Sequence, residues 1–393
     1  MVAFDVAPSE EVAVQSSGTY AQREARIFAA TQQWFQPVLT AFNDAHRSLR
    51  ARFAPNIIVP AKGLGGYPNP SLSVLFTPQG GQDLSAQFRS SNLDPTALLP
   101  GLLQAAQDFS GRLIGVPVDL SVYVVAYRGL AGGHISAPSP SWTVADFTAF
   151  CGGVALHGGR FMGRIARGGL GAPLTWLGFA EGYGGQIISS GKLSLTSTNV
   201  LRGLNALADV LHITWDLLFV RGTPSTPVVE FWTYSQTAPR PSLTTLLKNA
   251  VVRFPRAPVP VVPAVVTLAS VPQSAPQPEA GATFALWLLS RNGQTALTRI
   301  GFPGMRTDMD AASWLGKGPA GVRPGDLRFA PPQLTALNGM NFTERLSGIL
   351  LQPESARLPA LQKLQSVANS VIGGDANVFG AGAQLNRDGI PEV

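Results

Sequence analysis

The chain is poor in charged residues. Only 13% of its 393 residues are Asp, Glu, Lys or Arg, about half the fraction found in ordinary soluble domains. Hydrophobic residues make up 45%, which is enough for a folded core and argues against disorder. Little charge together with 42 glycines and 32 prolines predicts much surface that is turned away from bulk water and covered by subunit contacts.

Long hydrophobic runs are also lacking. A membrane-spanning helix needs about 20 consecutive apolar residues, but the run at 283–290 is too short and the run at 210–220 contains His212 and Asp216. The N-terminal sequence MVAFDVAPSEEVAV has acids where a signal peptide has basic residues. We therefore expect no membrane contact and an intracellular, self-associating protein.

Cysteine is almost absent, since Cys151 is the only one. One cysteine excludes an intramolecular disulfide framework and a cysteine-based zinc site. Asp308 and Asp310 lack the further ligands of a calcium loop. Zinc-binding pairs such as H-x-x-x-H are missing among the four histidines, which are His46, His134, His157 and His212. We predict no metal and no cofactor.

Glycine is concentrated in one segment, residues 151–185, where twelve of the 35 residues are glycine. Gly163 and Gly168 have the glycine spacing of a phosphate-binding loop, but Gly169 and Leu170 stand where that loop needs Lys and Ser or Thr. The segment therefore predicts no nucleotide site. Its glycines favour close backbone packing, at a subunit contact or an inner surface.

Cys151 and His157 are the one candidate pair of nucleophile and base. They leave open an alternative function, an intracellular Cys/His hydrolase. The commoner interpretation is that Cys151, which ends the apolar run TVADFTAF, is a buried small hydrophobic side chain. We predict that the protein is not an enzyme and has no catalytic residue.

Lysine is scarce as well, because 24 of the 29 basic residues are arginine, and the net charge is +6. Arginine binds phosphates and carboxylates through its planar fork, so the surface tolerates a polyanion. Two groups of arginines are candidates for contact with RNA or another subunit, Arg47, Arg50, Arg52, Arg160, Arg164 and Arg167. A nucleic-acid-binding protein that forms no shell is a second alternative.

Hydrophobic periodicity predicts mostly helices. Helical segments are expected over residues 20–53 with a kink at Pro37, and over 96–115, 143–151, 154–167, 198–219, 341–351 and 356–372. Strands are expected over 56–59, 71–76, 118–127 and 228–234, and an Asn292–Gly293 turn predicts a hairpin over 284–302. The fold class is α+β, dominated by helices, with short strands and long extended Pro/Gly-rich segments, and is not a clear jelly roll.

Composition divides the chain into five segments. Nine prolines between residues 239 and 278 indicate an extended segment that lies on a surface. The expected segments are an N-terminal arm (1–19), a main helical shell domain (20–238), the Pro-rich segment (239–278), a second part of the shell domain (279–372) and a C-terminal tail (373–393).

The chain resembles the helix-rich coat proteins of small double-stranded RNA viruses such as the partitiviruses. The features that carry the resemblance are the arm before a long helix (1–53), the Gly-rich segment (151–185), the Pro-rich run RFPRAPVPVVPAVV (253–266) and the low charge. It implies a structural protein of the virion and host cytoplasm that self-assembles into, or clamps, an icosahedral capsid. The implied partners are other copies of itself and RNA bound weakly and without sequence specificity, and other shell proteins are left open as further partners.

Overall fold

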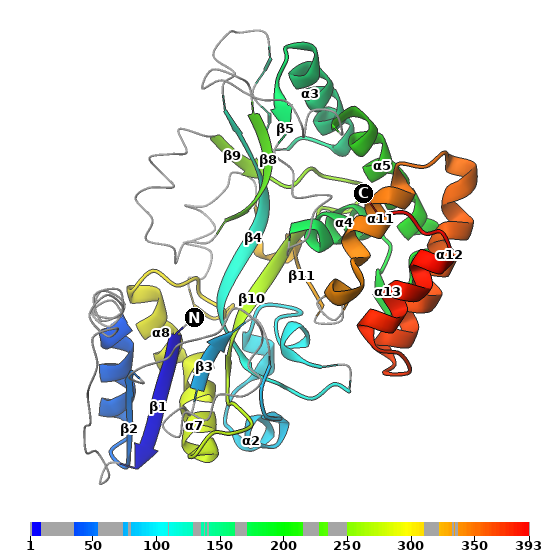
Figure 1. Ribbon diagram of the computed structural model, residues 1–393. Coiled ribbons are helices and arrows are strands. Elements are labelled where there is room, and N and C mark those ends of the chain that lie inside the picture. The colour runs from blue at the N-terminus through cyan, green and yellow to red at the C-terminus, as the bar shows by residue number, and fades with distance from the viewer. Residues whose placement is uncertain are drawn as a thin grey trace, which may run out of the picture. The chain divides into compact units, whose positions relative to one another are not determined.

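A computed structural model describes most of the chain. The described residues are 2–8, 35–53, 74–77, 80–128 without 109, 135–161 without 137 and 140, 171–214, 228–234, 250–309, 322–331, 334 and 337–392. They contain both helices and a mixed sheet, so the α+β, helix-rich fold class is confirmed in this coarse form (Figure 1). No helix among them is long and apolar enough to cross a membrane.

The chain forms two compact units, and each is built from two separate stretches of sequence. Unit 1 comprises Met1–Leu120 and Val266–Trp314, and unit 2 comprises Ser121–Val265 and Leu315–Val393. Two strands, β4 (Val116–Arg128) and β10 (Val262–Ser270), begin in one unit and end in the other. The five segments expected from composition are not tested by this division and stay a prediction.

The strands of unit 1 form an antiparallel arrangement in which β1 (Val2–Pro8) lies between β2 (Leu49–Phe53) and β3 (Val74–Thr77). Strand β3 also pairs with the end of β10, where Leu268 lies opposite Thr77. Residues 35–45 are helical, but the predicted helix does not continue to 53, because the chain turns at residue 47 and enters β2.

The helix predicted over 96–115 is wrong. The described residues of this stretch contain, as helices, only the short 3-10 helices η1 (Pro95–Ala97) and η2 (Gln104–Ala106). Pro100 disfavours a helix, and Gly101 and Gly111 adopt positive φ angles of 78° and 76° that end one. The apolar residues of the stretch are buried nonetheless, with Leu98, Leu99, Leu102 and Leu113 among them.

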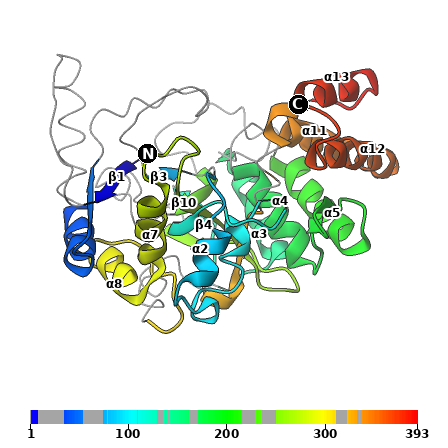
Figure 2. The same cartoon turned by 90° about the horizontal axis from the view of Figure 1, so that it is seen from below.

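The hairpin predicted around Asn292 is also wrong, since the segment forms two helices, α7 (Pro278–Leu289) and α8 (Arg291–Arg299). Ser290 ends α7 and caps α8, because its hydroxyl accepts a hydrogen bond from the Gly293 backbone N–H at 3.1 Å. Glycine is required at 293 by close approach, since a Cβ there would lie 2.1 Å from the Trp287 carbonyl oxygen. Figure 2 shows α7 and α8 side by side.

The strands of unit 2 include both parallel and antiparallel pairs. Strand β4 pairs antiparallel with β8 (Val228–Tyr234) and β9 (Ala250–Arg253). Strand β5 (Arg160–Phe161) pairs parallel with β8, and β11 (Leu327–Phe329) pairs parallel with the start of β10. The strands predicted over 118–127 and 228–234 are therefore confirmed, whereas residues 160 and 161 are extended rather than helical.

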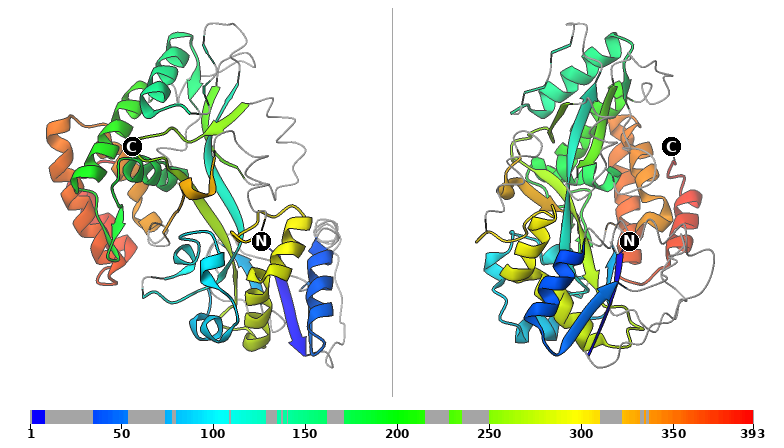
Figure 3. Two further views of the ribbon diagram at one scale, coloured as in Figure 1. Left: turned by 180° about the vertical axis from the view of Figure 1, so that it is seen from behind. Right: turned by 90° about the vertical axis from the view of Figure 1, so that its left-hand side faces the viewer.

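Helices of unit 2 bury a large apolar core. They are α3 (Val144–Leu156), α4 (Gly171–Gly182), α5 (Thr198–Thr214), α11 (Phe342–Leu350), α12 (Glu354–Ile372) and α13 (Val378–Arg387). Figure 3 shows α11, α12 and α13 together in orange and red. The core takes side chains from all six helices. Residues 378–387, expected to belong to a tail, are helical.

The smaller elements complete the described structure. They are the short helix α2 (Ser85–Ser90) in unit 1, and in unit 2 the hairpin β6 (Ile188–Ser189) and β7 (Lys192–Leu193) and the 3-10 helices η4 (Pro324–Asp326) and η5 (Leu337–Met340). In the Pro-rich segment, β10 is buried at both ends, with Val262 and Ala269 fully covered.

Candidate functional site

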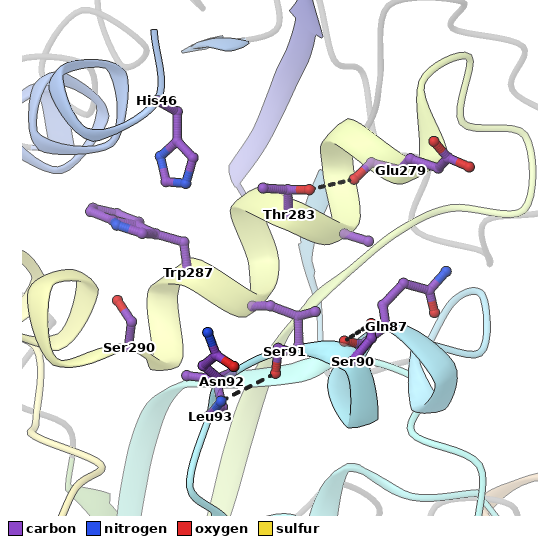
Figure 4. A pocket seen from close by; sticks show the side chains of 12 residues that line it. His46, Gln87, Ser90, Ser91, Asn92, Leu93, Glu279, Thr283, Trp287 and Ser290 are labelled. Atoms are coloured by element: carbon purple, nitrogen blue, oxygen red, sulfur yellow. Dashed lines mark hydrogen bonds between the residues drawn. The ribbon is translucent and has the colours of Figure 1, made fainter. Parts of the chain in front are cut away.

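A groove of about 550 Å³ lies within unit 1, between α7 and the chain around α2. We call it the α2–α7 groove. Figure 4 shows that its side chains come from α7, from α2 and the residues that follow it, and from the turn after the helix at 35–45. The lining residues are His46, Gln87, Ser90, Ser91, Asn92, Leu93, Glu279, Ala282, Thr283, Leu286, Trp287 and Ser290.

One face of α7 forms a wall of the groove. Glu279, Thr283 and Trp287 follow each other at intervals of four residues, which places them on the same side of a helix. Pro278 stands in the first turn, where its missing N–H breaks no helical hydrogen bond. The other faces are apolar and buried, with Phe284 and Leu288 fully covered, so packing fixes which face of α7 is turned to the groove.

The opposite wall is held by hydrogen bonds to distant parts of unit 1. The Leu113 backbone N–H donates to the Ser85 hydroxyl at 2.9 Å, which anchors the start of α2. Just before α2, the Gln82 amide donates to the Pro272 carbonyl at 2.8 Å. This bond joins the chain just before α2 to the chain six residues before α7 begins at Pro278.

Two aromatic rings close one end of the groove. The His46 ring stacks on Phe42 at a centroid distance of 4.2 Å and faces the edge of Trp287 at 6.3 Å. His46 Nδ1 donates a hydrogen bond to the Phe42 carbonyl at 3.0 Å, because a carbonyl oxygen can only accept. Trp287 also packs edge-on against Phe42 at 5.3 Å, which holds both rings in place.

Three of the four hydroxyl groups of the groove donate to backbone carbonyls, whereas the Ser290 hydroxyl accepts from the Gly293 backbone N–H. Ser90 donates to the Gln87 carbonyl at 3.0 Å, Ser91 to the Phe88 carbonyl at 2.6 Å and Thr283 to the Glu279 carbonyl at 2.9 Å. Gln87 Oε1 is buried and accepts no hydrogen bond. No lysine or arginine belongs to the described residues that line the groove. The groove therefore combines apolar surface with polar groups that include both donors and acceptors, and it carries one carboxylate, that of Glu279.

The arginines proposed from sequence lie outside this groove. Arg47 is exposed in the turn before β2. Within β2, Arg50 is exposed and Arg52 is half-buried. Arg160 begins β5. Arg164 and Arg167 fall outside the described residues. Nothing in the structure tests what the six arginines contact, so that role stays a prediction.

Cys151 and His157 do not form a reactive pair in this structure. Cys151 is buried in the core of unit 2, and burial raises the pKa of its thiol, which keeps it protonated and inert. His157 ends α3 on the exposed side. Cys151 is therefore unsuited to be the nucleophile that the hydrolase alternative requires.

No cluster of metal-binding side chains occurs among the residues the structure describes. Asp308 instead forms a close ion pair with Arg306, at 2.8 Å, and Asp310 lies outside the described residues.

Sequence comparison gives no relative, because no protein-family model matches the chain and no curated protein is significantly similar to it. Comparison of the fold with solved structures does give similar proteins. The chain is similar to the cyclic α-maltosyl-1,6-maltose binding protein of Arthrobacter globiformis, with 13% identity and a TM-score of 0.55 over 71% of this chain and 77% of that one.

Two further solved structures have the same fold. The maltose-maltodextrin binding protein of Alicyclobacillus acidocaldarius is 16% identical, with a TM-score of 0.53 over 85% of this chain and 96% of that one. An ABC transporter solute binding protein of Agrobacterium radiobacter, in complex with ribitol, is 16% identical, with a TM-score of 0.51 over 76% and 84%. The fold is thus that of solute-binding proteins.

This likeness overturns the resemblance to viral coat proteins. The predicted capsid, its place in the virion and host cytoplasm, its self-assembly and its RNA partner are wrong, because the similar structures are sugar- and solute-binding proteins. The physical reason is visible in the burial. Low charge indicated surfaces covered by other subunits, yet most large apolar side chains of the described residues are covered by the chain's own units, and only Leu156, Leu358 and Phe379 are exposed.

Sequence reasoning missed the groove, although one signal was present. The steps from Glu279 to Thr283, Trp287 and Ser290 are four, four and three residues, the period of one helical face. The Asn292–Gly293 dipeptide directed the interpretation of this stretch toward a hairpin, whose side chains alternate instead. The other wall has no such pattern, because α2 has only six residues.

Proposed function

We propose that the chain is the solute-binding protein of an ABC transporter and binds a small, hydroxylated molecule without changing it. The observation that supports this most is the fold, which the chain shares over 71% to 85% of its length with the three binding proteins named above. The proposed partner is the membrane component of that transporter, and the proposed place of action is outside the cytoplasmic membrane.

The α2–α7 groove supports the ligand class. Ligand sites combine apolar or aromatic surface with a few polar groups that fix orientation, and Trp287 lies here among serine, threonine, asparagine and glutamine side chains. The absence of lysine and arginine from the described lining disfavours phosphates and carboxylates, which arginine in particular recognises. The similar proteins are described with maltodextrins and ribitol, which are uncharged and hydroxylated.

Ligand binding to the purified full chain tests the proposal. We expect maltose, ribitol or another uncharged polyol to raise the melting temperature, because a ligand that binds only the folded state stabilises it by about 2.7 kcal/mol at a concentration one hundred times its Kd. Mass spectrometry should recover the ligand unchanged. If a wide panel of sugars and polyols leaves the melting temperature where it is, or if the ligand is converted, the proposal is wrong.

A further inference from the structure

Asn43 binds the backbone of β2 through both ends of its side-chain amide. Its Oδ1 accepts a hydrogen bond from the Ala51 backbone N–H at 2.7 Å, and its Nδ2 donates to the Ala51 carbonyl at 3.0 Å. The two bonds fix the orientation of the amide, because a backbone N–H needs an acceptor and a carbonyl needs a donor. Asn43 lies in the last turn of the helix at 35–45 and Ala51 in the middle of β2, so the amide holds the end of this helix against the strand.

The turn that carries His46 lies between these two residues. The His46 backbone N–H donates to the Phe42 carbonyl at 2.9 Å, so helical hydrogen bonding continues up to His46. The His46 carbonyl accepts from the Leu49 backbone N–H at 3.3 Å, which closes the turn onto the first residue of β2. The place of the His46 ring therefore depends on how the end of the helix and the start of β2 are held together.

The groove is affected by this arrangement through His46. His46 lines the groove, whereas Asn43 and Ala51 do not. Figure 4 shows the His46 ring beside the Trp287 indole, and the two ring centroids are 6.3 Å apart. A change in the position of the helix end would move the His46 ring relative to Trp287 and so alter this end of the groove.

We propose that Asn43 is a positioning residue of the α2–α7 groove, whose amide holds the turn at residues 46–48 so that the His46 ring is in place beside Trp287 before a ligand binds. A ligand that meets a ring already in place does not have to order it. Ordering one loose side chain on binding would weaken affinity by about two- to tenfold. The effect on affinity rests on the proposed function, whereas the effect on the ring does not.

Asn369 provides a matched control, because it makes the same pair of bonds within unit 2. Its Oδ1 accepts from the Leu193 backbone N–H at 2.7 Å and its Nδ2 donates to the Leu193 carbonyl at 3.1 Å, which joins α12 to β7. Asn43→Ala and Asn369→Ala each remove two hydrogen bonds to one strand residue, so their unfolding free energies should fall by comparable amounts. A difference between the two variants at the groove then reports position and not stability.

The His46 ring reports its own position without any ligand. NMR spectra of the full chain labelled at histidine give the ring signals, and loss of a signal in His46→Gln identifies that of His46. The Phe42 ring, stacked at 4.2 Å, shifts this signal away from that of an exposed histidine. We expect Asn43→Ala to move it towards the exposed value and Asn369→Ala to leave it unchanged. An unchanged signal in Asn43→Ala, or an equal shift in both variants, would overturn the proposal.

Calorimetry with maltose and ribitol tests the consequence for binding. We expect Asn43→Ala to bind about two- to tenfold more weakly than the native protein, and Asn369→Ala to bind as the native protein does. His46→Ala should also lose affinity, and adding Asn43→Ala to it should weaken binding no further, because Asn43 acts through His46. Additive losses would show that Asn43 acts by another route and would contradict the proposal.

A milder variant keeps the test valid if Asn43→Ala does not fold. Asn43→Asp retains an acceptor for the Ala51 N–H but has no donor for its carbonyl, so both effects should be smaller and in the same direction. If the His46 signal moves but no sugar or polyol binds the native protein, the positioning of the ring stands and solute binding is wrong. If ligands bind the native protein and Asn43→Ala equally well, solute binding stands and the positioning role is wrong.

Discussion

At the scale of single residues, Glu181 is a titratable group whose burial brings its change of charge close to neutral pH. It lies near the end of α4, where burial raises the pKa of its carboxyl to about 7, and Arg328 Nε, 3.6 Å from Glu181 Oε2, opposes this rise. The pKa of an ordinary glutamate is about 4.3. Between these two values the folded protein holds a proton that the unfolded chain releases.

Stability should therefore fall as the pH rises from about 4 to about 7, by at most about 4 kcal/mol from this residue. Glu181→Gln stays neutral, so its free energy of unfolding should not share this decrease, and the variant should be the more stable protein above pH 7. Urea unfolding at several pH values measures the difference, with Glu354→Gln as the exposed control. Parallel pH profiles for the native protein and Glu181→Gln would exclude the effect.

Cys151 is a residue whose role the sequence indicated well. An apolar run before it and glycines after it predict a buried thiol, and it packs in the core of unit 2 among Val125, Phe147 and Val154. The arginine roles could not be obtained in the same way, because a charged side chain leaves no periodic signal for what it contacts.

We expect Cys151→Ser to fold and to bind the same solute with unchanged affinity. The cost should be about 1 kcal/mol of unfolding free energy, since a hydroxyl then occupies a place where no polar partner was needed. The native thiol should react with a thiol reagent only as fast as the protein unfolds. Fast labelling of the native protein would show that Cys151 is exposed and reactive.

At the scale of elements, the strands were more predictable than the turns between helices. Residues 118–127 and 228–234 are β-branched and apolar, and both form the strands expected. The two wrong predictions, of a helix over 96–115 and of a hairpin over 284–302, both involve glycines. Glycine can end a helix, and it can also lie inside one. Gly101 and Gly111 end a helix through their positive φ angles, whereas Gly293 lies inside one because no side chain fits there. Sequence alone does not distinguish these cases.

Two helical glycines should respond oppositely to alanine. Gly293→Ala should destabilise unit 1 by about 1–3 kcal/mol, because the new Cβ would lie 2.1 Å from the Trp287 carbonyl oxygen. Gly152→Ala in α3 meets nothing within 4 Å and should stabilise the protein by up to about 1 kcal/mol through helix propensity. Denaturant titrations of both variants give the comparison, and a stable Gly293→Ala variant would mean that the start of α8 can shift.

At the scale of the whole molecule, composition indicated the right fold class and the wrong function. Helices and short strands follow from local patterns, so an α+β fold was accessible. The function could not be inferred from composition, because composition does not show which apolar residues cover each other. That is decided by contacts between segments far apart in the chain, and the hydrogen bond from Gln82 to Pro272 is one such long-range contact. Low charge cannot distinguish a chain that covers itself from one that is covered by its neighbours.

The division of each unit between two stretches of sequence has a consequence for synthesis on the ribosome. The first half of unit 1 ends at Leu120, but the helices that complete it, α7 and α8, emerge only after residues 121–265 have been made. Until then its apolar side chains have no α7 to pack against, and such exposed surface favours aggregation and chaperone binding. One wall of the α2–α7 groove is thus translated long before the other, so the order of translation makes the groove a late product of folding.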